Sequence, residues 1–184
     1  RESRVRSSVS FAPQRALLAR ASPKPDPLAV TQHVYAQPIN PPEALRSTQE
    51  AATKNQSWIE AVRDGLAEEM RANSSIQYFG EGIGERGGSF AHTKNLYQEF
   101  GAHRVVDTPI SEQGFTAAAI GASAIGARTV ADLMFADFCF ETAGQIFLQA
   151  AKLRYMSNGN MSTPVVIRVG SGSIRSAGPH HSGS

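Results

Sequence analysis

Short apolar segments alternate with segments of helical character from Asn55 onward, and this alternation limits the fold more than any other feature of the sequence. The apolar segments, which we predict to be strands, are 76–79, 104–107, 129–135 and 164–169. One predicted helix begins after Ser57, and three more occupy about 93–100, 112–127 and 140–156. Helices between strands provide the crossovers that parallel strands need. The sequence therefore predicts an α/β fold, in which a mainly parallel sheet is flanked by helices.

Local signals support two of these helices. Ser57 and Glu60 have the spacing of a capping box, and Gly101 can end the helix before it. The helix at 112–127 consists mostly of Gly and Ala, so that another backbone or another subunit can approach it closely.

The first 52 residues differ from the rest, because they hold most of the ten prolines and show no sustained periodicity. Segment Ser22–Pro27, SPKPDP, is predicted to be extended and partly solvated. The Arg- and Ser-rich, acid-poor start is also typical of an organelle transit peptide, which we keep as an alternative. The chain begins with Arg1, and no helix or strand closes its HHSGS end, so we expect a fragment of a longer polypeptide.

Composition argues against several classes of partner. A formal net charge of +2 is too small to indicate a nucleic acid partner. The longest apolar run, 115–127, is too short and too weakly hydrophobic to span a bilayer. Cys139 is the one cysteine, which allows no intrachain disulfide and fits a reducing compartment. It has no basic neighbour in sequence, so we expect an inert thiol.

The loop GEGIGERGG after the first strand contains the pattern G-x-G-x-x-G at Gly82, Gly84 and Gly87, and Asp107 follows twenty positions later. This pattern is typical of dinucleotide binding when a helix starts at the glycines. Here Glu81 stands close to where the phosphate is expected, and no helix is predicted directly after the glycines. We therefore favour a tight glycine turn, with a dinucleotide-binding module as the alternative.

Glu112 lies at the start of the Gly- and Ala-rich helix, in the segment DTPISEQGF. A structural role is available to it, because acids favour the amino ends of helices. Ile110 and Phe115 flank it, however, and apolar neighbours that exclude water raise the pKa of a carboxyl group. Glu112 is therefore also a candidate to share a proton with a ligand nitrogen.

Aromatic residues and histidines mark the loops after the last two strands. The segment MFADFCF contains Met134, Phe135 and Phe138. We predict Phe135 to be core, whereas an exposed aromatic ring here could stack on a flat heterocycle. The pair His180-His181 has no further ligand pattern beside it, which favours surface residues over a metal site. A catalytic or phosphate-contacting histidine is the alternative.

Four motifs, DTPISEQGF, MFADF, AAKLRYMS and PHHS, together resemble one known family. The region from about 55 to 184 is similar to the beta subunit of the thiamine diphosphate-dependent decarboxylating component of 2-oxo acid dehydrogenase complexes. That family includes the pyruvate, branched-chain 2-oxo acid and acetoin enzymes. The resemblance implies a transketolase-like pyrimidine-binding fold, incomplete at its carboxyl-terminal end.

A second resemblance lies in residues 13–36. The segment ALLARASPKPDPLAVTQHVYA is similar to the carboxyl-terminal tail of the alpha subunit of the same enzymes. It implies a fused alpha–beta chain, with an extended alpha-like tail and linker at 1–54 and the pyrimidine-binding domain at 55–184. The linker itself is expected at about 36–54.

The resemblance also implies roles for individual residues. Glu112 matches the glutamate that hydrogen-bonds the pyrimidine nitrogen of thiamine diphosphate, Phe138 the aromatic ring that stacks on the pyrimidine, and Met134 an apolar neighbour of the ring. His181 matches a histidine that lies near the reacting substrate and helps acyl transfer to a lipoyl group. The family holds the diphosphate and its magnesium through the alpha subunit, so no metal ligand is expected in this chain.

This chain departs from the family pattern at a few positions. His180 and Gly183 stand where the family usually has glutamines, and Gly144 replaces a common acid. These departures leave the substrate preference and the role of His181 open.

The resemblance implies a 2-oxo acid dehydrogenase that decarboxylates its substrate with thiamine diphosphate and passes the acyl group to a lipoyl carrier. The implied partners are the alpha part, the lipoyl-bearing acyltransferase and a small 2-oxo acid, in an α2β2-like oligomer of the cytoplasm or, alternatively, the mitochondrial matrix. The isolated chain is expected to be inactive, because it holds half a site. Alternatives are a transketolase-like or deoxyxylulose phosphate synthase-like enzyme, and a non-catalytic subunit-interface fragment.

Overall fold

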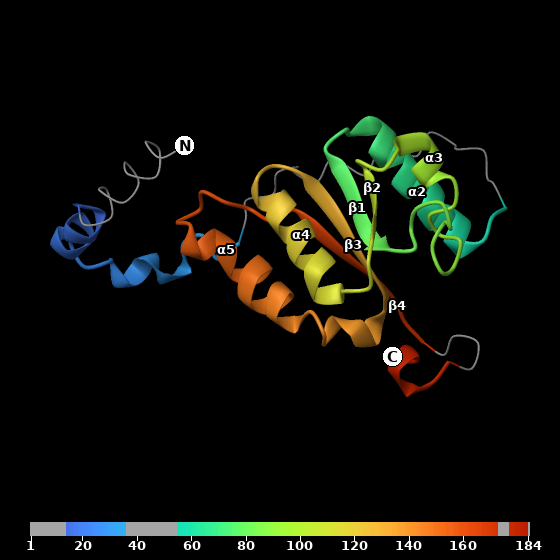
Figure 1. The fold of residues 1–184 in the computed structure, drawn as a ribbon. Coiled ribbons are helices and arrows are strands. Elements are labelled where there is room, and N and C mark those ends of the chain that lie inside the picture. Colours follow the sequence, from blue (N-terminus) through green and yellow to red (C-terminus); the bar gives the residue numbers. More distant parts are fainter. Residues whose placement is uncertain (1–13, 36–54, 173–176, 184) are drawn as a thin grey trace, which may run out of the picture. The chain divides into compact units, whose positions relative to one another are not determined.

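The described part of the chain falls into two compact units that divide between Gln32 and His33. The structure is a computed structural model, and it describes residues 14–35, 55–172 and 177–183 (Figure 1). The predicted linker at 36–54 lies outside these residues, and the domain boundary after residue 54 stays a prediction.

The first unit contains two short helical segments. Residues 14–21 are helical, because Ala, Leu and Arg are strong helix formers. A 3₁₀ helix follows at Pro27–Thr31, where the Asp26 carboxylate accepts a hydrogen bond from the Leu28 N–H at 2.9 Å. The sequence predicted an extended alpha-like tail, but this part of it contains two helical segments. Only residues 23–26, between them, form no regular element.

A four-stranded sheet forms the centre of the second unit (Figure 1). Its strands are β1 (Ile76–Glu81), β2 (Val105–Thr108), β3 (Arg128–Phe135) and β4 (Val165–Gly170). They are all parallel and lie in the order β2-β1-β3-β4. The predicted α/β fold with a parallel sheet is confirmed.

Helices cover both faces of this sheet (Figure 1). Helices α2 (Trp58–Ala72) and α3 (Leu96–Phe100) lie on one face, and α4 (Glu112–Ala124) lies on the other. The core on the α2 side contains Ala67, Met70, Tyr78, Ile83, Leu96 and Val105. The core on the α4 side contains Phe79, Phe115, Ala119, Ala131 and Leu133. Neighbouring β1 residues thus face opposite cores, as the period of two in a strand requires.

The predicted capping box begins α2. The Ser57 hydroxyl accepts the Glu60 N–H at 3.3 Å, and the Glu60 carboxylate accepts the Ser57 N–H at 2.8 Å. Both bonds satisfy amide groups that the helix itself leaves unpaired.

Two predicted helices are interrupted. The helix predicted from Thr93 starts only at Leu96, because Asn95 has a left-handed backbone (φ 71°) and the Thr93 hydroxyl is donated to the Ile83 carbonyl. The long helix predicted at 140–156 begins only at Gly144 and consists of two pieces, a π-helical segment at Gly144–Ala150 and α5 (Ala151–Met156); a separate 3₁₀ helix precedes it at Ala136–Cys139. Helix α4 likewise stops three residues early, before a glycine with φ 113° at position 126.

Candidate functional site

All four strands send their following loops to the same edge of the sheet, because the strands are parallel. Gly80 of β1 pairs with Asp107 of β2 on one side and with Asp132 of β3 on the other. The residues singled out by the sequence lie in the loops just beyond this row. The candidate site is therefore the carboxyl edge of the sheet.

Glu112 is the first residue of α4 and follows the N-cap Ser111. The Ser111 hydroxyl accepts the Gly114 N–H at 3.3 Å, which fixes the start of the helix. The Ser111 N–H is donated to the carboxylate of Glu81 at 3.2 Å. The end of β1 and the start of α4 thus bring two carboxyl groups, those of Glu81 and Glu112, to one place.

Glu81, and not Glu112, is the buried carboxyl group of this pair. Only 7% of Glu81 is exposed, whereas Glu112 is half-buried. Burial raises the pKa of Glu81, and the nearby charge of Glu112 raises it further. The apolar cover that the sequence suggested for Glu112 is incomplete, because Ile110 is 84% exposed. The sequence analysis used Glu81 only as an argument against phosphate binding at the glycine loop, and did not identify it as a buried carboxyl group.

The raised pKa of Glu81 predicts a pH-dependent stability. Protonation of Glu81 favours the folded chain, so its contribution is complete below the ordinary glutamate pKa of about 4.3 and is lost as pH rises through the raised pKa. We expect Glu81→Gln to remove this loss, so that the variant gains stability relative to wild type as pH increases. Urea unfolding between pH ~4 and ~8 measures the difference. The exposed Glu85→Gln is the control, and parallel profiles for Glu81→Gln and wild type would contradict the expectation.

An aromatic cluster lies beyond the end of β3. The rings of Phe135 and Phe138 meet edge to face at 5.6 Å, and the His181 ring lies 4.6 Å from Phe135 and 5.3 Å from Phe138. Phe90 contacts Phe135 at 5.7 Å. Phe135 is half-buried in this cluster, so its predicted place in the core is wrong. The register shift between β3 and β4 lies between Asp132 and Phe135, directly before this cluster.

The segment that carries His181 is tied to the same loop. The Gly183 N–H is donated to the Asp137 carboxylate at 3.0 Å, and the Gly172 N–H to the Gly183 carbonyl at 2.8 Å. His180 is exposed, whereas its neighbour His181 is half-buried against the phenylalanine rings. Of the two histidines, His181 therefore belongs to the candidate site.

Two of the four predicted site residues contact each other, because the rings of Phe138 and His181 meet at 5.3 Å. Met134 directly precedes Phe135 at the end of β3, and its sulfur accepts a hydrogen bond from the Ser89 hydroxyl. Glu112 lies at the same edge of the sheet beside Glu81, but the described residues show no hydrogen bond or ring contact between it and the cluster. The roles of these residues stay predictions.

The glycine loop does not form a pyrophosphate cradle. Gly82, Gly87 and Gly88 have positive φ, and no helix starts at them. A Cβ at Gly88 would lie 2.6 Å from the ring of His92, and one at Gly84 would lie 2.7 Å from the carboxylate of Asp107. The glycines therefore let the loop pack closely on its own side chains, as the preferred interpretation of the sequence had it.

A buried polar cluster that the sequence did not reveal lies next to these loops. The Asp132 carboxylate accepts hydrogen bonds from the Tyr78 hydroxyl at 2.6 Å and from Nε2 of His92 at 2.6 Å. Arg168 donates to the same oxygen at 3.0 Å. Burial alone would raise the pKa of Asp132, but the hydrogen bond from His92 and the charge of Arg168 outweigh it and lower the pKa. Asp132 is thus a buried carboxylate, and because a carboxylate can only accept, Nε2 of His92 is the donor of their hydrogen bond.

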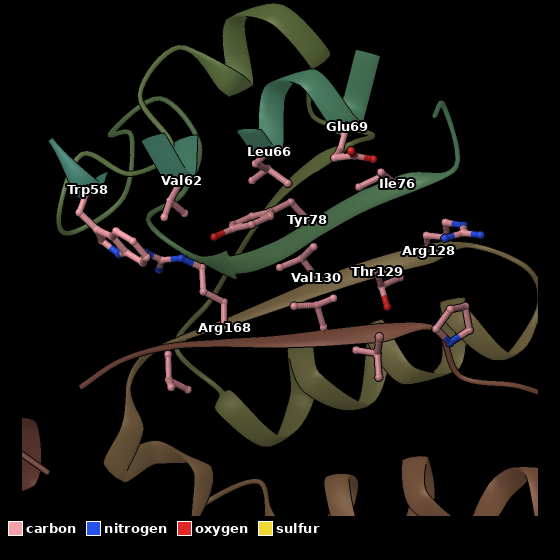
Figure 2. A pocket seen from close by; sticks show the side chains of 14 residues that line it. Trp58, Val62, Leu66, Glu69, Ile76, Tyr78, Arg128, Thr129, Val130 and Arg168 are labelled. Carbon is pink, nitrogen blue, oxygen red and sulfur yellow. The ribbon is translucent and has the colours of Figure 1, made fainter. Parts of the chain in front are cut away.

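A cleft in the described part of the chain lies elsewhere. It has a volume of about 630 Å³ and opens between α2 and the strands β1, β3 and β4 (Figure 2). Trp58, Val62 and Leu66 face it from α2, and Val130 faces it from β3. None of the predicted site residues lines it. Its apolar walls lie on the α2 face, away from the loops that carry the candidate chemistry.

Other kinds of site find no support in the described residues. No three His, Cys, Asp or Glu side chains gather there as metal ligands would. None of the helices in these ranges has the length and apolar character that crossing a membrane requires. Cys139 is half-buried, and burial raises the pKa of its thiol, which agrees with the expected inert side chain.

Comparison with known families decides the fold family. The family model for the transketolase pyrimidine-binding domain matches residues 54–184. The chain belongs to this family. The match begins one residue before the predicted start of the domain and includes all four strands and the loops of the candidate site. The pyrimidine-binding domain is thus the unit that presents Glu112, Met134, Phe138 and His181.

The similar curated proteins are beta subunits. The chain is 45% identical over 123 residues to the pyruvate dehydrogenase E1 component subunit beta of Rhizobium meliloti, covering 67% of this chain and 27% of that protein. It is 42% identical to the 2-oxoisovalerate dehydrogenase subunit beta of Bacillus subtilis, with 61% and 34% covered. It is 45% identical to the acetoin:2,6-dichlorophenolindophenol oxidoreductase subunit beta of Cupriavidus necator, with 65% and 38% covered. The pyrimidine-binding domain described here therefore spans about a third of the relatives that it matches.

Proposed function

We propose that this chain supplies the pyrimidine-binding part of a thiamine diphosphate-dependent enzyme that decarboxylates a 2-oxo acid and passes the acyl group to a lipoyl carrier. One observation carries the proposal. A carboxyl pair, Glu81 and Glu112, and an aromatic cluster around Phe138 stand at one edge of a pyrimidine-binding domain. Two of the beta subunits that the chain resembles are named for pyruvate and 2-oxoisovalerate, which are both 2-oxo acids and support a substrate of this class.

The residues at this edge fit an aminopyrimidine. A carboxyl group can exchange a hydrogen bond and a proton with a ring nitrogen, and Glu112 is half-buried and available for this. The buried Glu81 beside it has a raised pKa, so the Glu81 carboxyl group keeps its proton to a higher pH than an ordinary glutamate does. The carboxyl pair can therefore hold a proton next to the ligand. The ring of Phe138 offers an aromatic face or edge to a flat heterocycle.

In the proposed reaction, bound thiamine diphosphate supplies the electron sink for loss of carbon dioxide. Glu112 binds the pyrimidine nitrogen and sets its protonation. Met134 and Phe138 orient the ring and exclude water from it. His181 lies against Phe135 and Phe138, where it can hold or release a proton at its imidazole for the substrate or the acyl group.

The remaining parts of the enzyme lie outside the described domain. We propose that an alpha part holds the diphosphate and its magnesium, and that a lipoyl-bearing acyltransferase receives the acyl group. The Gly- and Ala-rich face of α4 supports assembly into an α2β2-like oligomer, because small residues permit close packing. A cytoplasmic enzyme is proposed, with the mitochondrial matrix as the alternative, since the relatives include bacterial and plant mitochondrial proteins.

The test of this function is release of carbon dioxide. The intact protein that carries this chain is combined with its alpha part, magnesium, thiamine diphosphate and an oxidised lipoyl acceptor, and is given pyruvate or a branched-chain 2-oxo acid, with a sugar phosphate in a parallel assay. We expect turnover of at least one 2-oxo acid that disappears when thiamine diphosphate is omitted. Turnover that does not depend on the cofactor, or that is confined to sugar phosphates, would contradict the proposal and favour a transketolase-like enzyme.

The stacking role predicted for Phe138 can be tested separately. We expect Phe138→Ala to raise the Kd for thiamine diphosphate roughly 2- to 12-fold, because an aromatic contact contributes about 0.5–1.5 kcal/mol beyond its area burial. Calorimetric titration of the intact protein measures this. Phe140→Ala is a matched control, since Phe140 lies in the same loop and is 86% exposed. Equal effects of the two substitutions would refute a specific role for Phe138.

A further inference from the structure

Met134 has a backbone conformation that is rare for a residue with a side chain. Its φ is 57°, in the left-handed region. It lies at the register shift between β3 and β4, which falls between Asp132 and Phe135. Residues in such conformations cluster at binding sites and persist only when the surrounding contacts hold them. The contacts of Met134 therefore decide how it faces the candidate site.

Two hydrogen bonds hold Met134. Its N–H is donated to Oδ1 of Asp132 at 3.0 Å, and the Ser89 hydroxyl is donated to its sulfur at 2.9 Å. The first bond fixes the backbone two residues beyond Asp132, and the second fixes the end of the side chain. The backbone bond depends on where the Asp132 carboxylate points.

The other oxygen of Asp132 is held by three donors from three parts of the fold. They are Tyr78 of β1, His92 of the loop after β1 and Arg168 of β4, which all reach Oδ2. Tyr78, His92 and Asp132 are each about 1% exposed. Figure 2 shows Tyr78 and Arg168 reaching over the sheet from their two strands. The carboxylate is therefore clamped, and Oδ1 remains for Met134.

Asp132 must accept hydrogen bonds from the three donors with one oxygen and from the Met134 N–H with the other. An ionised carboxylate can do this, because both of its oxygens accept. An asparagine at position 132 has one acceptor and one NH₂ donor. If its oxygen accepted from the three donors, its NH₂ group would face the Met134 N–H. If its oxygen accepted from Met134, its NH₂ group would face the guanidinium of Arg168, which can only donate. Either orientation sets donor against donor in a buried place, which is costly.

We propose that Asp132 is a positioning residue of the pyrimidine site: clamped by His92, Tyr78 and Arg168, it fixes Met134 in the left-handed conformation that presents its side chain to the cofactor ring. That the ring is the pyrimidine of thiamine diphosphate rests on the proposed function. The hydrogen bonds around Asp132 and Met134 are independent of that function. Asp132 touches no substrate and acts through Met134.

The first experiment needs no cofactor. The full chain is prepared with ¹³C-methyl methionine, and the four methyl signals are assigned by single substitutions to leucine. We expect Asp132→Asn to shift or broaden the signal of Met134, while the signal of Met70, which is fully buried in the α2-side core, stays in place. The control Asp107→Asn changes an exposed carboxylate that holds Gly84, and should leave Met134 unchanged. An unmoved Met134 signal in Asp132→Asn overturns the proposal.

The second experiment measures the Kd of thiamine diphosphate with magnesium for the intact protein. We expect Asp132→Asn to weaken binding at least about tenfold, the size usual for losing a group that orients a ligand-binding residue at metal sites. If the Met134 signal moves and the affinity stays within about twofold, the positioning role is overturned while the proposed function stands. If the wild-type protein binds no thiamine diphosphate, the proposed function fails and the inference falls with it.

A pair of substitutions at His92 keeps the test open if Asp132→Asn does not fold. His92→Leu removes one donor from the clamp but leaves Tyr78 and Arg168 in place. His92→Gln retains an NH₂ donor near the same oxygen. We expect His92→Leu to shift the Met134 signal and weaken cofactor binding, and His92→Gln to restore much of both. Identical behaviour of the two variants would mean that His92 only fills space, and would overturn the clamp.

Discussion

Replacing Glu112 by Gln in the intact protein is expected to lower thiamine-dependent decarboxylation about 10²- to 10⁴-fold, the range that a positioned acid or base contributes. Glutamine keeps the size of the side chain and its hydrogen-bonding capacity, but it cannot exchange a proton with the pyrimidine nitrogen. Helix α4 should still form, because its cap comes from Ser111. The kcat of the variant, measured at saturating cofactor, gives the result.

Two controls separate this loss from a structural one. Subunit assembly, followed by analytical ultracentrifugation, should be the same for the wild type and for Glu112→Gln. The exposed Glu141→Gln, in the loop after β3, should have near-normal kcat. Turnover of Glu112→Gln within about threefold of wild type would sink the role proposed for Glu112.

Truncating Asp132 to Ala is expected to have the largest effect on stability. Removing one partner of a buried charged cluster typically costs about 3–5 kcal/mol, because the remaining groups are left without their acceptor. Here Tyr78, His92 and Arg168 all lose it. Arg168 is 23% exposed and can regain water, so we expect a loss near the lower limit, about 3 kcal/mol. Urea unfolding of the full chain at neutral pH measures the loss.

Asp137→Ala is the matched control for this truncation. Asp137 is half-buried, and its carboxylate accepts one hydrogen bond, from the Gly183 N–H. Losing this bond should lower the free energy of unfolding by about 1 kcal/mol. Equal destabilisation by the two truncations would show that the cluster around Asp132 adds nothing beyond one ordinary hydrogen bond.

The sheet was predictable because its strands are short apolar runs with helices between them. Each predicted strand agrees with an observed one to within two residues at either end. The capping box at Ser57 and Glu60 was equally visible, since its spacing is local. The fold family followed from motifs that continue through the loops at the carboxyl edge.

The missed features depend on contacts between residues far apart in sequence. Asp132 and Tyr78 are 54 positions apart, and Asp132 and His92 are 40 apart, so no local pattern joins them. Glu81 looked like an interruption of a glycine motif, because its hydrogen-bond partner, the N–H of Ser111, lies 30 positions away. The π-helical segment at Gly144–Ala150 was missed because its apolar residues keep a helical spacing. The clue at Asp132 was a charged residue between the apolar residues Ala131 and Leu133 in the middle of β3.

Parallel titrations with two ligands test the identity of the cofactor most directly. The intact protein that carries this chain is titrated by calorimetry with thiamine diphosphate and magnesium, and in parallel with NAD. We expect saturable binding of thiamine diphosphate that weakens in Phe138→Ala, and no binding of NAD. Tight binding of NAD together with no binding of thiamine diphosphate would contradict this expectation.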